Sequence, residues 1–195
     1  MKTAVILIAR AGAGKGTQAE FLKEYFGKDE TLYLYAGDVL RELARKPDSL
    51  SGKYMQEKIM NIGEKAPDFS AIWAWADAMI RQFRDEIEAV IIDGSPRTRL
   101  EALILDEALL FYEIENVKPL FFEITREEAL IRLLKRGRSD DTPEKIERRF
   151  AYYERVVTPA IEYYRTESKH KLVTIDAMPS PEKIFEQIKR VLSST

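Results

Sequence analysis

The sequence contains no cysteine and a single histidine, His170. It therefore has no disulfide, no thiolate metal site and no thiol nucleophile, and it cannot build a cluster of histidine ligands. The absence of cysteine fits a reducing compartment, so we expect a cytoplasmic protein. His170 lies in the polar stretch of residues 166–171, "TESKHK", which predicts a solvent-exposed side chain.

Long apolar runs and a strong net charge are also absent. The apolar run near the N-terminus covers only residues 4–9, too few for a signal-peptide core or a membrane span. The formal net charge is −2 over 195 residues, so no global basic field favours nucleic acid or a membrane surface as a partner. We expect a monomer with one globular domain over residues 1–195.

Short apolar stretches alternate with stretches of helical periodicity. Residues 3–9 are apolar and β-branched without alternation, which is typical of a strand buried on both faces. Four more strands are predicted at residues 32–35, 89–93, 119–124 and 172–176. Pro143 predicts a helix start, with Thr142 as its N-cap. This alternation predicts an α/β fold, a five-stranded parallel sheet covered by helices on both faces, with ligands at the carboxyl ends of its strands.

Residues 37–88 interrupt the alternation, because they show little strand signal and read as two short helices and a longer one. We expect a helical flap here, inserted into a core formed by residues 1–36 and 89–195. The longest helix carries Trp73 and Trp75. A spacing of two places them on different helix faces, so at most one is expected deep in the core.

A glycine-rich turn, "ARAGAGKGTQ", follows the first predicted strand. Gly12, Gly14 and Gly16 let the backbone curl so that successive N–H groups point inward, and the helix that starts near Lys15 adds its positive dipole end. Lys15 supplies a full charge and Thr17 a hydroxyl. A strand, a glycine-rich turn and a helix are the context of a phosphate-binding loop. The alternative is a strand-to-helix turn without a ligand.

The stretch departs from the general phosphate-loop pattern G-x-x-x-x-G-K-[ST] at both ends. Ala9 replaces its first glycine, and Gly16 stands where a hydroxyl residue is usual. The order "GKGT" instead resembles the adenylate kinase branch of the nucleoside monophosphate kinases, in which G-x-P-G-x-G-K-G-T opens the chain. Ala11 takes the place of that family's proline.

Three further stretches are similar to that family and occur in its order. Residues 36–42, "AGDVLRE", resemble T-G-D-x-L-R, and residues 91–98, "IIDGSPRT", resemble D-G-F-P-R-T. Residues 132–164 resemble its arginine-rich segment with R-x-D-D. Four matches over nearly the whole chain identify it as a member of this family. The resemblance implies a P-loop NTPase fold and transfer of the γ-phosphoryl group of ATP to a nucleoside monophosphate with Mg²⁺.

The resemblance also implies roles for individual residues. The ATP phosphates would lie against the loop residues Gly12, Ala13, Gly14, Lys15, Gly16 and Thr17. The acceptor nucleotide would contact Ala36, Asp38, Arg41, Asp93, Gly94, Arg97, Glu101, Arg138 and Arg149. Lys15 would neutralise charge at the transferring group together with Arg132, Arg136, Arg138 and Arg149. Any one arginine could instead occupy a solvated helix face, which we expect for Arg99, Arg148 and Arg155.

These residue types suit phosphoryl transfer because the reaction gathers negative oxygens, and catalysis is mainly positioning and charge neutralisation. Since Gly16 cannot ligate a metal, Mg²⁺ is expected to meet Asp93 through a water molecule. Asp38 is a second outer-shell acid or a helix N-cap. Asp140 and Asp141 either anchor a lid by bonding arginines or cap the following helix.

Two regions depart from the family. The lid is reduced to about residues 136–141, so we expect the arginine segment and the flap to exclude water together. In the base pocket, Ala36, Ser95 and Glu101 replace the family's threonine, aromatic residue and glutamine. A carboxylate only accepts hydrogen bonds, so Glu101 complements guanine's two donors better than adenine's mixed edge.

Three functions follow as hypotheses. The first is a nucleoside monophosphate kinase, with AMP as the leading acceptor and GMP or a broader choice as the alternative. If Glu101 reads the base, Glu101→Gln is expected to favour AMP, whereas a solvent-facing Glu101 leaves the base to the backbone near residues 65–67. The second is a P-loop kinase of another small acceptor, against which Arg41 and Arg97 argue as a pair suited to an acceptor phosphate. The third is a nucleotide-binding switch protein without turnover.

Overall fold

The computed structural model describes residues 2–137 and 142–193. They form a parallel sheet of five strands in the order β2-β3-β1-β4-β5, as predicted. The strands are β1 (Thr3–Ala9), β2 (Thr31–Tyr35), β3 (Ala89–Asp93), β4 (Asn116–Glu123) and β5 (Val173–Asp176). β1 is the central strand and pairs with β3 and β4, which explains why it is apolar on both faces.

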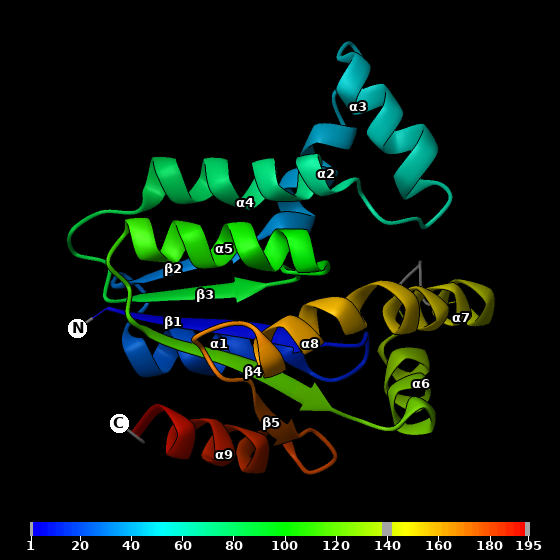
Figure 1. Ribbon diagram of the computed structural model, residues 1–195. Helices are drawn as coiled ribbons and strands as arrows, with labels where there is room; N and C mark the ends of the chain where they lie inside the picture. The colour runs from blue at the N-terminus through cyan, green and yellow to red at the C-terminus, as the bar shows by residue number, and fades with distance from the viewer. Residues whose placement is uncertain (1, 138–141, 194–195) are drawn as a thin grey trace.

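Helices cover both faces of the sheet (Figure 1). Their bounds are α1 (Lys15–Phe26), α2 (Ala36–Ala44), α3 (Leu50–Tyr54) continued by a π-helical turn (Met55–Met60), α4 (Asp68–Gln82), α5 (Arg99–Phe111), α6 (Arg126–Arg136), α7 (Pro143–Tyr152) continued by a second π-helical turn (Tyr153–Val157), α8 (Thr158–Thr166) and α9 (Pro181–Ser193). Thr142 is the N-cap of α7, and its side chain accepts a hydrogen bond from the Lys145 N–H, so this prediction is confirmed.

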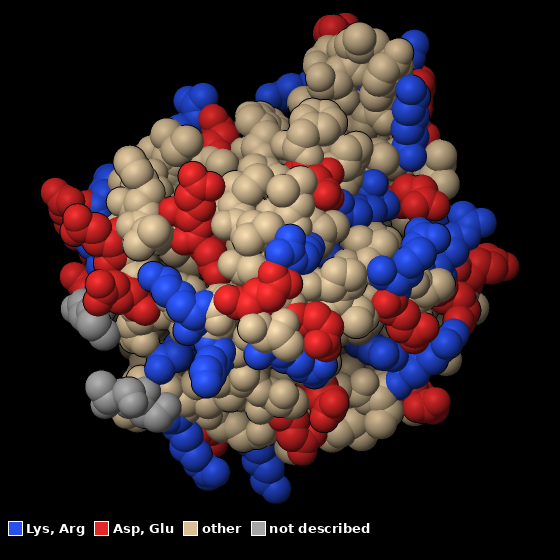
Figure 2. Space-filling view, in the orientation of Figure 1, with Lys and Arg blue, Asp and Glu red and all other residues tan. Residues whose placement is uncertain are grey.

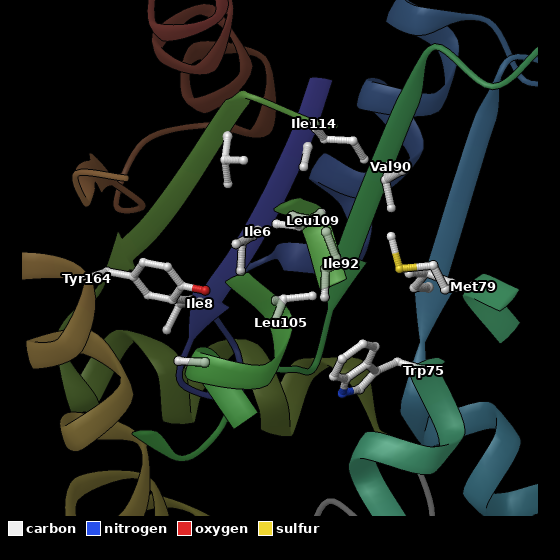
Figure 3. Close-up of a cluster of buried hydrophobic side chains, with 14 of the residues drawn as sticks. Ile6, Ile8, Trp75, Met79, Val90, Ile92, Leu105, Leu109, Ile114 and Tyr164 are labelled. Atoms are coloured by element: carbon white, nitrogen blue, oxygen red, sulfur yellow. The ribbon is translucent and has the colours of Figure 1, made fainter. Parts of the chain in front are cut away.

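The side chains of β1 alternate between two apolar cores. Ile6 and Ile8 pack with residues of α4, α5 and α8 (Figure 3), whereas Val5 and Leu7 pack with residues of α1, α6, α7 and α9. Each face of the strand thus has its own layer of helices. This arrangement fixes the carboxyl edge of the sheet, where the loop after β1 begins.

The range predicted for the flap contains two kinds of segment. α2 and the π-helical turn after α3 contribute to a small apolar cluster that also includes Ala74 of α4, and α3 projects from the body of the molecule (Figure 1). α4 instead lies on the sheet, where Trp75 and Met79 join the core around Ile92 (Figure 3). Trp75 is 2% exposed and Trp73 is 44% exposed, which confirms that only one tryptophan lies deep in the core.

The prediction that His170 is solvent-exposed is wrong, because the residue is 7% exposed. Asp106 of α5 accepts hydrogen bonds from the hydroxyls of Tyr163, Tyr164 and Ser168. These bonds hold the end of α8 and the following turn against α5, and the His170 N–H donates to Ser168 Oγ. The polar composition of the stretch reflects this internal network, and burial lowers the pKa of His170.

Candidate active site

The loop between β1 and α1 has the backbone geometry of an anion-binding turn. Gly12 and Gly14 have positive φ angles of 91° and 86°, a region that favours glycine. A Cβ atom on Gly12 would lie 2.6 Å from the Ala129 carbonyl oxygen of α6, so a side chain does not fit there. Gly14 is the N-cap of α1 and has no side chain with which to cap it. A helix N-terminus of this kind favours phosphate.

Lys15 begins α1, and its Nζ donates to the Ala9 carbonyl oxygen at 3.2 Å. Burial lowers the pKa of Lys15, the Asp93 carboxylate opposes this shift, and the Arg97 and Arg136 guanidinium groups add to it. The charged groups that shift the pKa of Lys15 thus lie at the end of β3 (Asp93), in the loop after β3 (Arg97) and at the end of α6 (Arg136). Negative ligand oxygens placed among these cations would relieve their mutual repulsion.

Asp93 ends β3 beside the phosphate loop and is 5% exposed. Its Oδ2 accepts a hydrogen bond of 3.0 Å from the Tyr33 hydroxyl on the neighbouring strand β2. Its Oδ1 is buried and accepts no hydrogen bond from any described residue. Burial and the Asp93 carboxylate both raise the pKa of Tyr33, so this hydroxyl stays a donor. One oxygen of Asp93 is thus fixed, and the other is left for a ligand.

A cavity of about 1590 Å³ opens over this loop and the carboxyl ends of the strands. It brings most of the predicted site residues together, namely Gly12, Ala13, Gly14, Lys15, Gly16, Thr17, Asp38, Arg41, Asp93, Gly94, Arg97, Arg132, Arg136 and Arg149. Arg138 lies outside the described residues, as do Asp140 and Asp141. Arg97 is held in place by a 2.7 Å bond from its Nε to the Gly94 carbonyl oxygen.

Arg132 lies on the cavity wall, but its guanidinium is engaged elsewhere. It donates to the carbonyl oxygens of Ala177 and Met178 at 2.8 and 2.9 Å and to Glu128 at 2.7 Å. These bonds tie α6 to the loop after β5, which also lines the cavity. A role for Arg132 at the transferring group stays a prediction.

Asp38 and Arg41 form an ion pair in α2, and the Arg41 guanidinium lies 5.2 Å from the centre of the Tyr35 ring. The alternative that Asp38 is a helix N-cap is wrong, because α2 begins at Ala36 and Tyr35 occupies the N-cap position. Asp38 falls in the first turn, where its charge favours the helix. Tyr35 was not predicted as a site residue, yet it lines the same cavity.

The three arginines that match no motif are exposed, as predicted. One of them, Arg148 of α7, donates a 3.3 Å hydrogen bond to the Ile62 carbonyl oxygen, which follows the turn after α3. The segment that follows the π-helical turn after α3 is therefore in contact with α7. In this conformation the bond links two segments that are 86 residues apart in the chain.

The family model described as "Adenylate kinase" matches residues 7–169. The chain belongs to the adenylate kinase family. It is accordingly an ATP-dependent phosphotransferase of the nucleoside monophosphate kinase type. The first of the three functional hypotheses is thereby favoured over the other two.

Similar members of the adenylate kinase family carry different names. The chain is 32% identical to adenylate kinase of Thermus thermophilus, with 97% of this chain and 96% of the relative aligned. It is 33% identical to uridylate kinase of Schizosaccharomyces pombe, with 98% of each aligned. It is 34% identical to UMP-CMP kinase 3 of rice, over 98% of this chain and 86% of the relative. Similarity alone thus leaves the acceptor base open.

A second cavity, of about 130 Å³, shares Arg41, Gly94 and Arg97 with the first. Its wall contains Ala36, Ser95 and Glu101, the three positions at which the predicted base pocket departs from the family pattern. The rest of the wall includes Leu40, Ile59, Met60, Ala66 and Ala71. The wall also carries the charged residues Arg41, Glu64, Lys65 and Arg97, so apolar and charged side chains both line the cavity.

Glu101 is fully buried, so the alternative that it points to solvent is wrong. Its N–H donates to Oγ1 of Thr98, the N-cap of α5, and its Oε2 accepts from the Arg97 N–H at 2.9 Å. This reciprocal arrangement is a variant of a capping box. Glu101 therefore has a structural task as well, but that task uses only one carboxylate oxygen.

Besides Tyr35, sequence reasoning missed the side chains of Lys65 and Tyr33 at these cavities. Tyr33 could have been found, because strand pairing places its hydroxyl beside the end of β3. Lys65 lies in the stretch "GEKAPD" between two helices and carries no motif. Its position depends on how the flap returns to the core, which no local pattern indicates.

Proposed function

We propose that this protein transfers the γ-phosphoryl group of ATP to a nucleoside monophosphate, with AMP as the leading acceptor. One observation carries the proposal: a single cavity has the phosphate loop with Lys15 on one wall and Arg41 with Arg97 on another. The loop suits the ATP phosphates, and the arginine pair suits the acceptor phosphate. Two phosphate-binding groups in one cavity fit a transfer between two nucleotides.

In the proposed reaction an oxygen of the acceptor phosphate forms a bond to the γ-phosphorus of ATP. The bond from that phosphorus to the β–γ bridging oxygen breaks, and the electron pair stays with ADP. The acceptor phosphate is already an anion, so no residue has to remove a proton. Lys15, Arg136 and Arg149 would neutralise the charge on the transferring oxygens, together with Arg138. Arginine suits this task because its planar group binds two oxygens at once.

The donor set of the site fits Mg²⁺ in an outer-shell arrangement. The residues that the structure describes contain no cluster of three or more acidic or histidine side chains that could hold a metal directly. Asp93 Oδ1 is buried and unpartnered, so it could accept a hydrogen bond from a metal-bound water. Bound with ATP, Mg²⁺ supplies charge neutralisation at the β- and γ-phosphates. Tyr33 would hold the Asp93 carboxylate in position.

GMP is the second candidate acceptor, and Glu101 is the observation that favours it. Guanine offers two adjacent donors, and Glu101, whose Oε1 accepts no hydrogen bond from a described residue, lines a cavity that could receive them. We also propose that the protein acts as a cytoplasmic monomer without a nucleic-acid partner. On the face drawn in Figure 2 basic and acidic side chains are interspersed. No described helix is long and apolar enough to cross a membrane.

A substrate panel tests the proposal. ATP is incubated with AMP, GMP, CMP or UMP and the wild-type protein, and formation of ADP and of the acceptor diphosphate is followed by chromatography. With GMP, CMP or UMP we expect ADP and the acceptor diphosphate in equal amounts. With AMP we expect two molecules of ADP for each ATP consumed and the fastest rate, and Lys15→Met should lower product formation by about 100-fold or more. ATP hydrolysis without a phosphorylated acceptor would contradict the proposal. Transfer to a small molecule that is not a nucleotide would favour the second hypothesis.

A further inference from the structure

The small cavity contains two buried polar atoms without a hydrogen bond from a described residue, one of which, Glu101 Oε1, is ion-paired with Lys65. Glu101 Oε1 and Ser95 Oγ have no hydrogen-bond partner within residues 2–137 and 142–193. Glu101 is fully buried and Ser95 is 2% exposed, and both line the cavity. A buried polar atom without a partner costs about 1–3 kcal/mol. The wall is therefore suited to a polar ligand.

Lys65 brings a positive charge to the same wall. Its Nζ lies 3.5 Å from Glu101 Oε1 and forms an ion pair with the Asp68 carboxylate. Asp68 is held in turn by a 3.3 Å hydrogen bond from the Thr98 hydroxyl. The Lys65 side chain is 16% exposed, so its charge is placed in a defined position rather than left in solvent.

We propose that Lys65 and Glu101 together recognise the base of the acceptor nucleotide and that this pair makes the site suitable for adenine. Glu101 Oε1 accepts a hydrogen bond from the 6-amino group, and Lys65 Nζ donates one to N1. A lone carboxylate would leave the N1 acceptor of adenine without a partner. The two side chains supply the acceptor and the donor that a single amide would otherwise combine. This inference rests on the proposed function.

A purely structural role for Lys65 predicts a different behaviour. As a counter-ion of Asp68 and Glu101, Lys65 would stabilise the start of α4 and α5 without touching the nucleotide. Its removal would then weaken the protein and lower the use of every acceptor by the same factor. The readout that separates the two roles is a ratio between two acceptors that differ at one atom.

The experiment compares AMP with 1-deaza-AMP, in which a C–H group replaces N1. For the wild type we expect kcat/KM to be about 10- to 100-fold higher for AMP, because a charge-assisted hydrogen bond is lost with the analogue. For Lys65→Met we expect this ratio to fall to within about twofold of one, mainly through KM of the acceptor. Both acceptors are measured in one preparation, so any unfolded fraction cancels from the ratio.

Two more comparisons complete the test. Lys58→Met removes an exposed lysine of the same flap and is expected to keep the wild-type ratio. Purine riboside 5′-monophosphate lacks the 6-amino group. Its kcat/KM is expected to be lower than that of AMP in the wild type and similar to that of AMP in Glu101→Ala. A ratio of AMP to 1-deaza-AMP that Lys65→Met leaves unchanged overturns the inference, as does a wild type that uses GMP but not AMP. Failure of all four nucleotides in the panel would instead contradict the proposed function itself.

Discussion

The two cavities of this protein differ in what their walls are made of. The large one, of about 1590 Å³, is lined by the phosphate loop, Lys15 and five described arginines at positions that match the family pattern. The small one, of about 130 Å³, departs from that pattern at Ala36, Ser95 and Glu101 and gains Lys65. Under the proposed function, the large cavity would carry out the phosphoryl transfer and the small one would select the acceptor base.

The largest effect is expected at the phosphate loop. Lys15→Met should lower turnover by about 100-fold or more, because charge contacts to a transferring group are typically worth that much. Burial lowers the pKa of Lys15 in the folded protein, so its charge opposes folding below that pKa. The melting temperature should therefore stay the same or rise. Turnover within about tenfold of wild type would show that the large cavity does not determine the reaction.

Arg97→Ala tests whether the large cavity has separate binding groups for ATP and for the acceptor. We expect KM of the acceptor to rise by roughly 10- to 100-fold with little change in KM of ATP, because the loss of a charged hydrogen bond affects one substrate. Arg99→Ala is the matched control, since Arg99 is exposed and pairs with Glu167. Steady-state kinetics with each substrate varied in turn measures both constants. Equal changes in the two KM values would exclude an acceptor-side role for Arg97.

Glu101→Gln tests the small cavity. From the sequence alone this change is expected to favour AMP, because an amide offers a donor and an acceptor. The structure alters that expectation: the Arg97 N–H needs an oxygen, so the amide nitrogen must take the place of Oε1. An N–H donor then occupies the former position of Oε1 and faces the adenine amino group, which is itself a donor. We expect about a tenfold loss of kcat/KM for AMP with an unchanged melting temperature, and a gain for AMP would refute this geometry.

The smallest effect is expected for Tyr33→Phe, which removes the hydroxyl that holds Asp93. A neutral donor to a carboxylate contributes about 1–3 kcal/mol, so urea unfolding should show a loss in that range. Because Asp93 can then rotate, the Mg²⁺ concentration for half-maximal turnover should rise a few-fold. Tyr25→Phe, at an exposed position of α1, serves as the control. An unchanged Mg²⁺ dependence would separate Tyr33 from the metal.

Local sequence patterns were sufficient to predict the sheet and the phosphate-binding loop. Residues 3–9 were predicted as a strand and form β1, because burial on both faces leaves a continuous apolar run. Thr142 was predicted as an N-cap because capping depends on neighbours in sequence. The phosphate loop was found for the same reason, since its glycines and Lys15 lie within a few residues of one another.

The surroundings of His170, Lys65 and Arg132 could not be predicted, because they depend on contacts between segments that are distant in sequence. His170 looked exposed by composition, but its N–H donates to Ser168 Oγ, and the Ser168 hydroxyl donates to Asp106 of the distant helix α5. Lys65 approaches Glu101 only because the flap returns to the core beside the start of α5. Arg132 matched a motif, yet its partners Ala177 and Met178 belong to a loop after the last strand. Sequence periodicity carries no signal for such pairings.

The bond from Arg148 to the Ile62 carbonyl oxygen has a consequence for the speed of the enzyme. It is a single solvent-exposed contact of 3.3 Å, and bonds of this kind contribute only about 0.5–1.5 kcal/mol. Thermal energy breaks such a contact many times during one millisecond, the slow end of domain motion. The contact between α7 and the segment after α3 is therefore easily broken, and we expect departure of the product nucleotides to be fast compared with the transfer step.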